Sequence, residues 1–132
     1  MPLPAVLIVD SDLGFIVWLS YELHKRNIQA LPARTIEEAR TMLAHFRSEP
    51  DLLIMNCSIP DTCRFARELA EERPNAAIIG IISDGNGCKG CADVLTAQFH
   101  DPSDKAPDQL LYWVGVIELL VGRGGRHHDR ES

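Results

Sequence analysis

The chain has 132 residues, of which 45% are hydrophobic and 24% charged, with a net charge of −6. This length suits one domain that buries an apolar core without disulfides or metal. The acidic balance, without a basic stripe, argues against a nucleic-acid surface, and no apolar run has the length of a membrane span. Four cysteines behind an N-terminus that lacks signal-peptide features favour reduced thiols in a cytoplasmic protein.

Short apolar runs alternate with segments of helical periodicity along the chain. The runs are typical of strands that are buried on both faces, and the helical segments each have one apolar face. In chain order we expect a strand at 5–9, a helix at 13–27, a strand at 28–31, a helix at 35–46, a strand at 51–55, a helix at 62–74, a strand at 76–83, a strand within 92–99 and a helix at 107–122.

Four of these boundaries have recognisable signals. Asp12 stands where an N-cap belongs, and Thr35 with Glu38 has the spacing of a capping box. Pro74 ends the third helix, and Pro107 suits the first turn of the last one.

Strands that alternate with helices predict an α/β fold, a flavodoxin-like doubly wound parallel sheet with strand order 2-1-3-4-5. The working crevice of such a sheet lies at the carboxyl ends of the strands, where the strand order reverses. This rule brings Asp10, Ser11 and Asp12 opposite Asn56, with Ser83 beside them. The candidate site therefore consists of two carboxylates, one amide and two hydroxyl groups.

The sequence resembles the receiver domains of two-component response regulators over residues 4 to 121. VLIVDSD looks like the acidic stretch after their first strand, and PDLLIMNCSIP looks like the third strand, which carries the phospho-acceptor Asp. IIGIIS is similar to the fourth strand and GCADVLTAQF to the fifth, which normally ends in Lys and Pro. The resemblance implies phosphoryl transfer from a donor to the acceptor Asp, with Mg²⁺ held by the acids.

Several positions depart from the pattern of that family. When the family's motifs are aligned with this sequence, Asn56 takes the position of the phospho-acceptor, and Asp10 and Ser11, followed by Asp12, take the positions of the acidic pair. Ser83 takes the position of the hydroxyl residue, Ala97 that of the lysine and Gln98 that of the proline. The carboxamide of Asn56 is not a nucleophile. Asn56 and Ser11 are neutral where the family has carboxylates, so the site lacks two of the negative charges that favour Mg²⁺ binding. We therefore expect no enzymatic activity and weak or absent Mg²⁺ binding. A simpler role for the remaining acids is a polar strand end at Asp10 and a helix cap at Asp12.

Thirteen residues separate Ser83 from Ala97, so the fourth helix of the family is expected to be shortened or missing. The last helix has two apolar stripes, and one of them can pack on the sheet. The second stripe comprises Leu111, Tyr112, Val116 and Leu119. It indicates a protein partner or a homodimer, unless the missing helix lets the last helix bury more of itself.

The four cysteines allow a second hypothesis. Cys88 and Cys91 form a CxxC pair, and Cys57 and Cys63 follow the third predicted strand. Four converging thiolates would suit zinc, and a dithiol would suit a redox switch. Ordinary thiols are the simpler interpretation, because Cys57 directly follows Asn56 and should point away from the crevice.

The sequence thus predicts a receiver-like domain at residues 1–122 and a flexible tail or linker at 123–132. Its expected function is a degenerate, phosphorylation-independent interaction module of two-component signalling, with no nucleic-acid or membrane partner. Alternatives are a cysteine-based metal- or redox-sensing domain on the same fold and, less favoured, a receiver that accepts phosphate at another residue.

Overall fold

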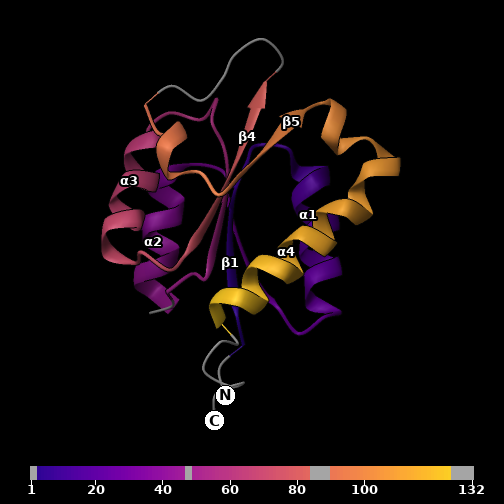
Figure 1. Cartoon of the computed structure of the whole chain (residues 1–132), viewed down its shortest axis with the longest axis horizontal. Helices are drawn as coiled ribbons and strands as arrows, with labels where there is room; N and C mark the ends of the chain where they lie inside the picture. Colours follow the sequence, from indigo (N-terminus) through magenta and orange to yellow (C-terminus); the bar gives the residue numbers. More distant parts are fainter. Residues whose placement is uncertain (1–2, 47–48, 84–89, 126–132) are drawn as a thin grey trace.

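The computed structural model describes residues 3–46, 49–83 and 90–125, which form a parallel sheet between two layers of helices (Figure 1). The sheet has the order β2-β1-β3-β4-β5, and the predicted flavodoxin-like topology is therefore confirmed. The strands are β1 (Ala5–Val9), β2 (Gln29–Ala33), β3 (Leu52–Asn56), β4 (Ala77–Ser83) and β5 (Ala97–Asp101).

The described residues contain four α-helices and three single 3₁₀ turns. They are α1 (Leu13–His24), α2 (Ile36–Phe46), α3 (Thr62–Glu72), η1 (Ala92–Val94), η2 (Ser103–Lys105), η3 (Pro107–Gln109) and α4 (Leu110–Gly125). In residues 90–96 the crossover from β4 to β5 holds only η1, and residues 84–89 lie outside the described part. Helix α4 extends three residues beyond the predicted boundary at 122, while 126–132 lie outside the description. No helix in the described part is long and apolar enough to cross a bilayer.

The sheet separates two apolar cores. On one face Leu7, Leu53 and Met55 pack with residues of α2 and α3, and on the other Ile8 and Ile54 pack with α1 and α4 (Figure 1). All residues of β1 and β3 are buried, because helices cover both faces of these central strands. Their carboxyl ends therefore lead into a crevice whose floor is the middle of the sheet.

Two predicted caps are present, one of them in altered form. The Asp12 carboxylate accepts a hydrogen bond from the Phe15 amide at 3.1 Å, as an N-cap should. The Thr35 hydroxyl accepts from the Glu38 amide at 3.1 Å, but the Glu38 carboxylate accepts from the Arg34 amide at 2.8 Å. The box therefore closes one residue earlier than its usual form.

A glycine allows the crossover to lie close to the sheet. A Cβ atom at Gly80, in the middle of β4, would lie 2.8 Å from Leu95 Cδ1 and 3.3 Å from Cys57 Sγ. A side chain at this position would force Leu95 or Cys57 to shift, so Gly80 allows the short segment before β5 to lie close against β4.

Trp113 anchors α4 to the sheet and to α1. Its ring is fully buried, stacks on Phe99 of β5 at 3.8 Å between centroids, and meets the Phe15 ring edge-on at 5.0 Å. Its Nε1–H donates to the Asp104 carbonyl at 2.8 Å, which ties the β5–α4 connection to the helix. One side chain thus joins three elements and satisfies its own polar atom.

We predict that Trp113→Ala lowers the free energy of unfolding by about 3–5 kcal/mol, because it opens a large cavity between these elements. Trp113→Phe keeps one aromatic ring in the core but removes part of the indole and the donor to Asp104, so we expect a smaller loss of about 1–3 kcal/mol. Urea denaturation followed by circular dichroism measures both, and equal losses would contradict the role given to the packing.

Candidate functional site

The crevice at the carboxyl ends of β1 and β3 is built around Asp10. This carboxylate is 1% exposed and directly follows β1. Its Oδ1 accepts from the Asp12 amide at 3.1 Å and from Asn56 Nδ2 at 3.2 Å. The other end of the Asn56 side chain, Oδ1, accepts from the amide and the hydroxyl of Ser58 at 3.0 and 2.7 Å. An amide fits here because it donates on one side and accepts on the other, which a carboxylate cannot do.

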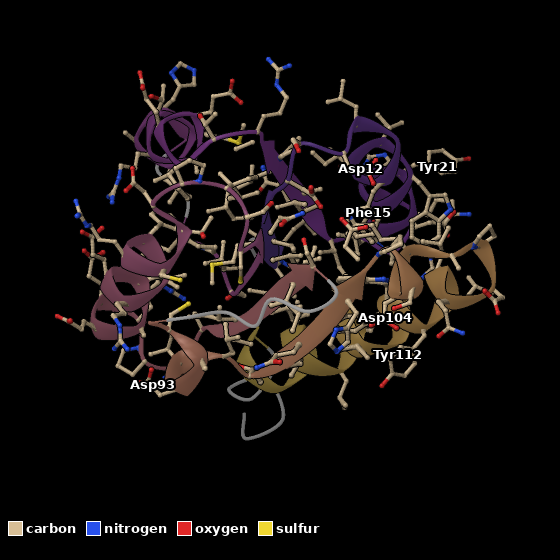
Figure 2. All side chains as sticks on the ribbon, turned by 90° about the horizontal axis from the view of Figure 1, so that it is seen from above. Asp12, Phe15, Tyr21, Asp93, Asp104 and Tyr112 are labelled. Carbon is tan, nitrogen blue, oxygen red and sulfur yellow. The ribbon has the colours of Figure 1, made fainter. Side chains whose placement is uncertain are left out.

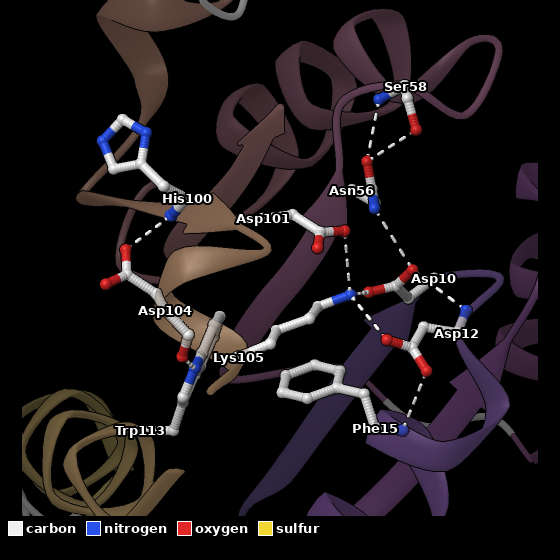
Figure 3. A network of polar contacts seen from close by, with 10 residues as sticks. All are labelled: Asp10, Asp12, Phe15, Asn56, Ser58, His100, Asp101, Asp104, Lys105 and Trp113. Atoms are coloured by element: carbon white, nitrogen blue, oxygen red, sulfur yellow. Dashed lines mark hydrogen bonds and ion pairs between the residues drawn. The ribbon is translucent and has the colours of Figure 1, made fainter. Parts of the chain in front are cut away.

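A buried ammonium group completes the site. Lys105 Nζ lies 2.8 Å from Asp10 Oδ2, 3.2 Å from Asp12 Oδ2 and 3.3 Å from Asp101 Oδ2 (Figure 3). The Lys105 side chain is 7% exposed, and its nitrogen also lies 4.6 Å from the centroid of the Phe15 ring. One ammonium therefore binds three carboxylates that come from two ends of the chain.

The turn that presents Lys105 is held at several points. A cis peptide bond joins Asp101 to Pro102 directly after β5. The Asp104 carboxylate accepts from the His100 amide at 2.6 Å, and its carbonyl accepts from Trp113 Nε1 (Figure 3). The η2 turn is thus fastened to the end of β5 on one side and to α4 on the other.

The ionisation of the site follows from these contacts. Burial by itself lowers the pKa of Lys105, but its hydrogen bond with Asp10 and the charges of Asp10 and Asp101 outweigh burial and raise the pKa above 10.5. Burial tends to raise the pKa of Asp12, yet the Phe15 amide and the Lys105 ammonium lower it below 3.8. Both groups are therefore charged over the whole physiological range.

The predicted site residues are only partly brought together. Asp10, Asp12 and Asn56 lie in the crevice as expected, and Ser11 beside them is exposed. Ser83 ends β4 in register with Asp101 of β5.

The assignment of Ala97 was wrong. Ala97 pairs with Ile79 at the start of β5, about 13 Å along the strand from its carboxyl end. Gln98 is the next residue of β5 and likewise lies far from the crevice. The strand runs on to Asp101, and Pro102 follows it. The strand predicted within 92–99 ends too early, because the exposed His100 and the half-buried Asp101 do not continue an apolar run.

Lys105 is a site residue that the sequence patterns do not predict. It lies four residues after the strand, in a short polar segment that has no periodicity. A proline after polar residues at 100–101 was the available signal for the true end of β5, and it would have directed attention to the lysine that follows.

The cysteines are only partly within the described residues. Cys88, one of the four cysteines in the zinc or redox hypothesis, lies outside them. In the part of the chain that the structure describes, no group of three or more His, Cys, Asp or Glu could hold a metal ion. Cys63 and Cys91 do come together, with their sulfur atoms 2.8 Å apart.

Comparison with known proteins gives the fold its context. No family model matches the chain, and no curated protein matches it. Among solved structures, a response regulator from Thermotoga maritima is 19% identical with a TM-score of 0.68, covering 91% of this chain and 98% of that one. A two-component response regulator from Clostridium difficile is 16% identical with a TM-score of 0.69, covering 92% and 98%. A structure described as a novel family of redox sensors in the streptococci, evolved from two-component response regulators, is 17% identical with a TM-score of 0.73, covering 98% and 55%. At these identities the likeness establishes a receiver-like fold.

We predict that Lys105→Met lowers the free energy of unfolding by about 3–5 kcal/mol at neutral pH, because it leaves the buried Asp10 carboxylate without its cation. The raised pKa of Lys105 means that its ion pairs contribute fully below pH 10.5 and are lost as the pH rises through the higher folded-state value. The wild-type protein should therefore lose stability as the pH rises above 10.5, and the variant should not show this loss. Urea denaturation at a series of pH values measures both effects.

Lys25→Met is the matched control. Lys25 pairs with Glu22 at 3.2 Å, but its side chain is 48% exposed. Its removal should change stability by no more than about 0.5 kcal/mol. A similar loss in both variants would show that Lys105 does not act through buried ion pairs.

Proposed function

We propose that this chain is a cytoplasmic, non-enzymatic receiver-like module of two-component signalling that acts by protein contact and not by phosphoryl transfer. The observation that carries the proposal is the combination of Asn56 with the Lys105 ammonium in the crevice. An acyl phosphate needs a carboxylate nucleophile, and the residue at the end of β3 is an amide that already bonds Asp10 and Ser58.

The residues also do not fit Mg²⁺, the ion that the receiver fold implies. Hard divalent cations need several oxygen ligands with net negative charge. Here the carboxylates of Asp10, Asp12 and Asp101 each lie within 3.3 Å of one ammonium nitrogen, and Asn56 contributes no charge. A divalent cation would have to displace the Lys105 ammonium from all three carboxylates, so binding should be weak or absent.

Two other functions have less support. A receiver that accepts phosphate at another residue would need a carboxylate with a free face, and the crevice carboxylates face the Lys105 ammonium. A cysteine-based metal sensor would need a ligand cluster, and the described residues contain none.

The first test uses isotope-labelled protein and nuclear magnetic resonance. We expect Mg²⁺ with acetyl phosphate or beryllofluoride to leave the amide signals around Asn56 unshifted. Saturable shifts at Asn56, Asp10 and Ser83 would overturn the proposal.

The double variant Asn56→Asp/Lys105→Ala provides the matched comparison. It returns a carboxylate to the end of β3 and removes the competing ammonium from Asp10. We expect Mg²⁺ to shift the crevice signals of this variant and not those of the wild type. If neither protein responds, charge balance is not what excludes the ion.

Helix α4 provides the proposed contact surface. The first apolar stripe, predicted to comprise Leu110, Val114, Ile117 and Val121 with Trp113, faces the core. Leu110 is partly buried, and the other four residues are at most 3% exposed. On the outer side Leu111, Tyr112 and Leu119 are 70%, 64% and 55% exposed. Figure 2 labels Tyr112 pointing outward beside β5, and its ring lies 5.8 Å from that of Phe99. Val116 differs from the prediction, since it is partly buried against the core.

We expect the isolated domain to self-associate through this outer side of α4, because apolar side chains gathered there are stabilised when they leave water. Leu111→Glu/Leu119→Glu should convert the dimer to a monomer in light scattering without changing the circular dichroism spectrum. Ala44→Glu, an exposed substitution on α2 in the other helical layer, should have no effect. A monomeric wild-type protein would rule out self-association and leave a different protein as the partner.

A further inference from the structure

The pair Cys63 and Cys91 lies away from the crevice, on the face of the sheet that α2 and α3 cover. Cys63 is in the first turn of α3, and Cys91 immediately precedes η1 in the crossover between β4 and β5. Their sulfur atoms are 2.8 Å apart, compared with about 2.05 Å in a disulfide. Twenty-seven residues separate the two cysteines, so only the fold brings them together.

Arg67 holds the crossover in place over Cys63. It lies one turn further along α3, and its Nε donates to the Gly90 carbonyl at 2.6 Å. Its two terminal nitrogens bond the Asp93 carboxylate at 2.8 and 3.4 Å. Because Gly90 and Asp93 flank Cys91, this clamp fixes the backbone on both sides of the second sulfur.

The two thiols differ in access. Cys91 is fully buried, whereas Cys63 is only partly buried and lies where the dipole of α3 favours negative charge. An oxidant from solvent therefore reaches Cys63 first, and Cys91 is the thiol placed to react next.

We propose that Cys63 and Cys91 form a reversible disulfide by exchange with a small-molecule disulfide such as oxidised glutathione. The Cys63 thiolate attacks one sulfur of the oxidant, the sulfur–sulfur bond of the oxidant breaks, and one glutathione thiolate leaves. The Cys91 thiolate then attacks the Cys63 sulfur of the mixed disulfide and releases the second glutathione. Two protein thiols lose two protons and two electrons in all, and one oxidised glutathione becomes two reduced ones.

The bond would fasten the β4–β5 crossover to α3. That crossover is already held by Leu95 against Gly80 and by the Arg67 clamp, so the disulfide would add a covalent link to a segment that is close to its bonded position. This modification is independent of the proposed function, because the hydrogen bonds and ion pairs of Asp10, Asn56 and Lys105 described above do not involve either sulfur atom.

The full chain carrying Cys57→Ser/Cys88→Ser retains only the two cysteines in question. After incubation with oxidised glutathione we expect it to lose the mass of two hydrogen atoms, to resist thiol alkylation and to give a cross-linked peptide pair. Dithiothreitol should restore both thiols, and the oxidised form should unfold at a higher temperature. The same cross-link should dominate peptide maps of the oxidised wild-type protein.

Arg67→Gln tests the clamp while keeping both sulfur atoms, and Arg64→Gln, an exposed change on the same helix, is its control. We expect disulfide formation to slow several-fold in the first variant and to keep its wild-type rate in the second. A glutathione adduct that persists without cross-linking, or a wild-type cross-link that involves Cys57 or Cys88, would overturn the proposal. Equal rates of disulfide formation in the two arginine variants would show that Arg67 does not position Cys91.

Discussion

The arrangement of the crevice depends on one ammonium group and the carboxylates around it. Without Lys105, the buried Asp10 would face Asp12 and Asp101 with no cation within contact distance among the described residues. Like charges gathered in a partly buried site are unfavourable, so the Lys105 ammonium stabilises the arrangement of these strand ends. This chain supplies that cation from its own sequence, as Lys105.

That solution links parts of the molecule that are distant in sequence. Lys105 is 95 residues from Asp10, and its position depends on Asp104, which bonds both the end of β5 and Trp113 of α4. Trp113 in turn packs on Phe99 and Phe15. The Phe15 amide donates a hydrogen bond to the N-cap Asp12, and the Phe15 ring lies beneath the Lys105 ammonium. The apolar core under α4 and the polar crevice thus share residues and form one structural unit.

The sequence was sufficient for the fold because its signals are local and repeated. The buried runs at 5–9 and 52–56, the Asp12 cap and the helical spacing each predict an element, and the order of elements limits the topology. Asp10, Asp12 and Asn56 could be predicted because they end or follow central strands. Lys105 could not, because its role comes from a turn whose path depends on tertiary contacts with Trp113 and His100. Ala97 was misplaced for a related reason, since polar residues at the carboxyl end of an edge strand carry no periodic signal.

The connection between Trp113 and Lys105 also bears on the proposed contact surface of α4. The outer side of α4 is apolar and exposed, while its inner side holds the turn that carries the ammonium. A shift of α4 on binding a partner would move Asp104, and with it Lys105, relative to Asp10 and Asp12. The separation of charges in a poorly solvated site opposes such a shift. The ion pairs of Lys105 would therefore hold α4 in one position, and a partner would have to bind α4 in that position. Under the proposed function, the crevice would therefore serve to fix the contact surface, and this role needs no phosphoryl group.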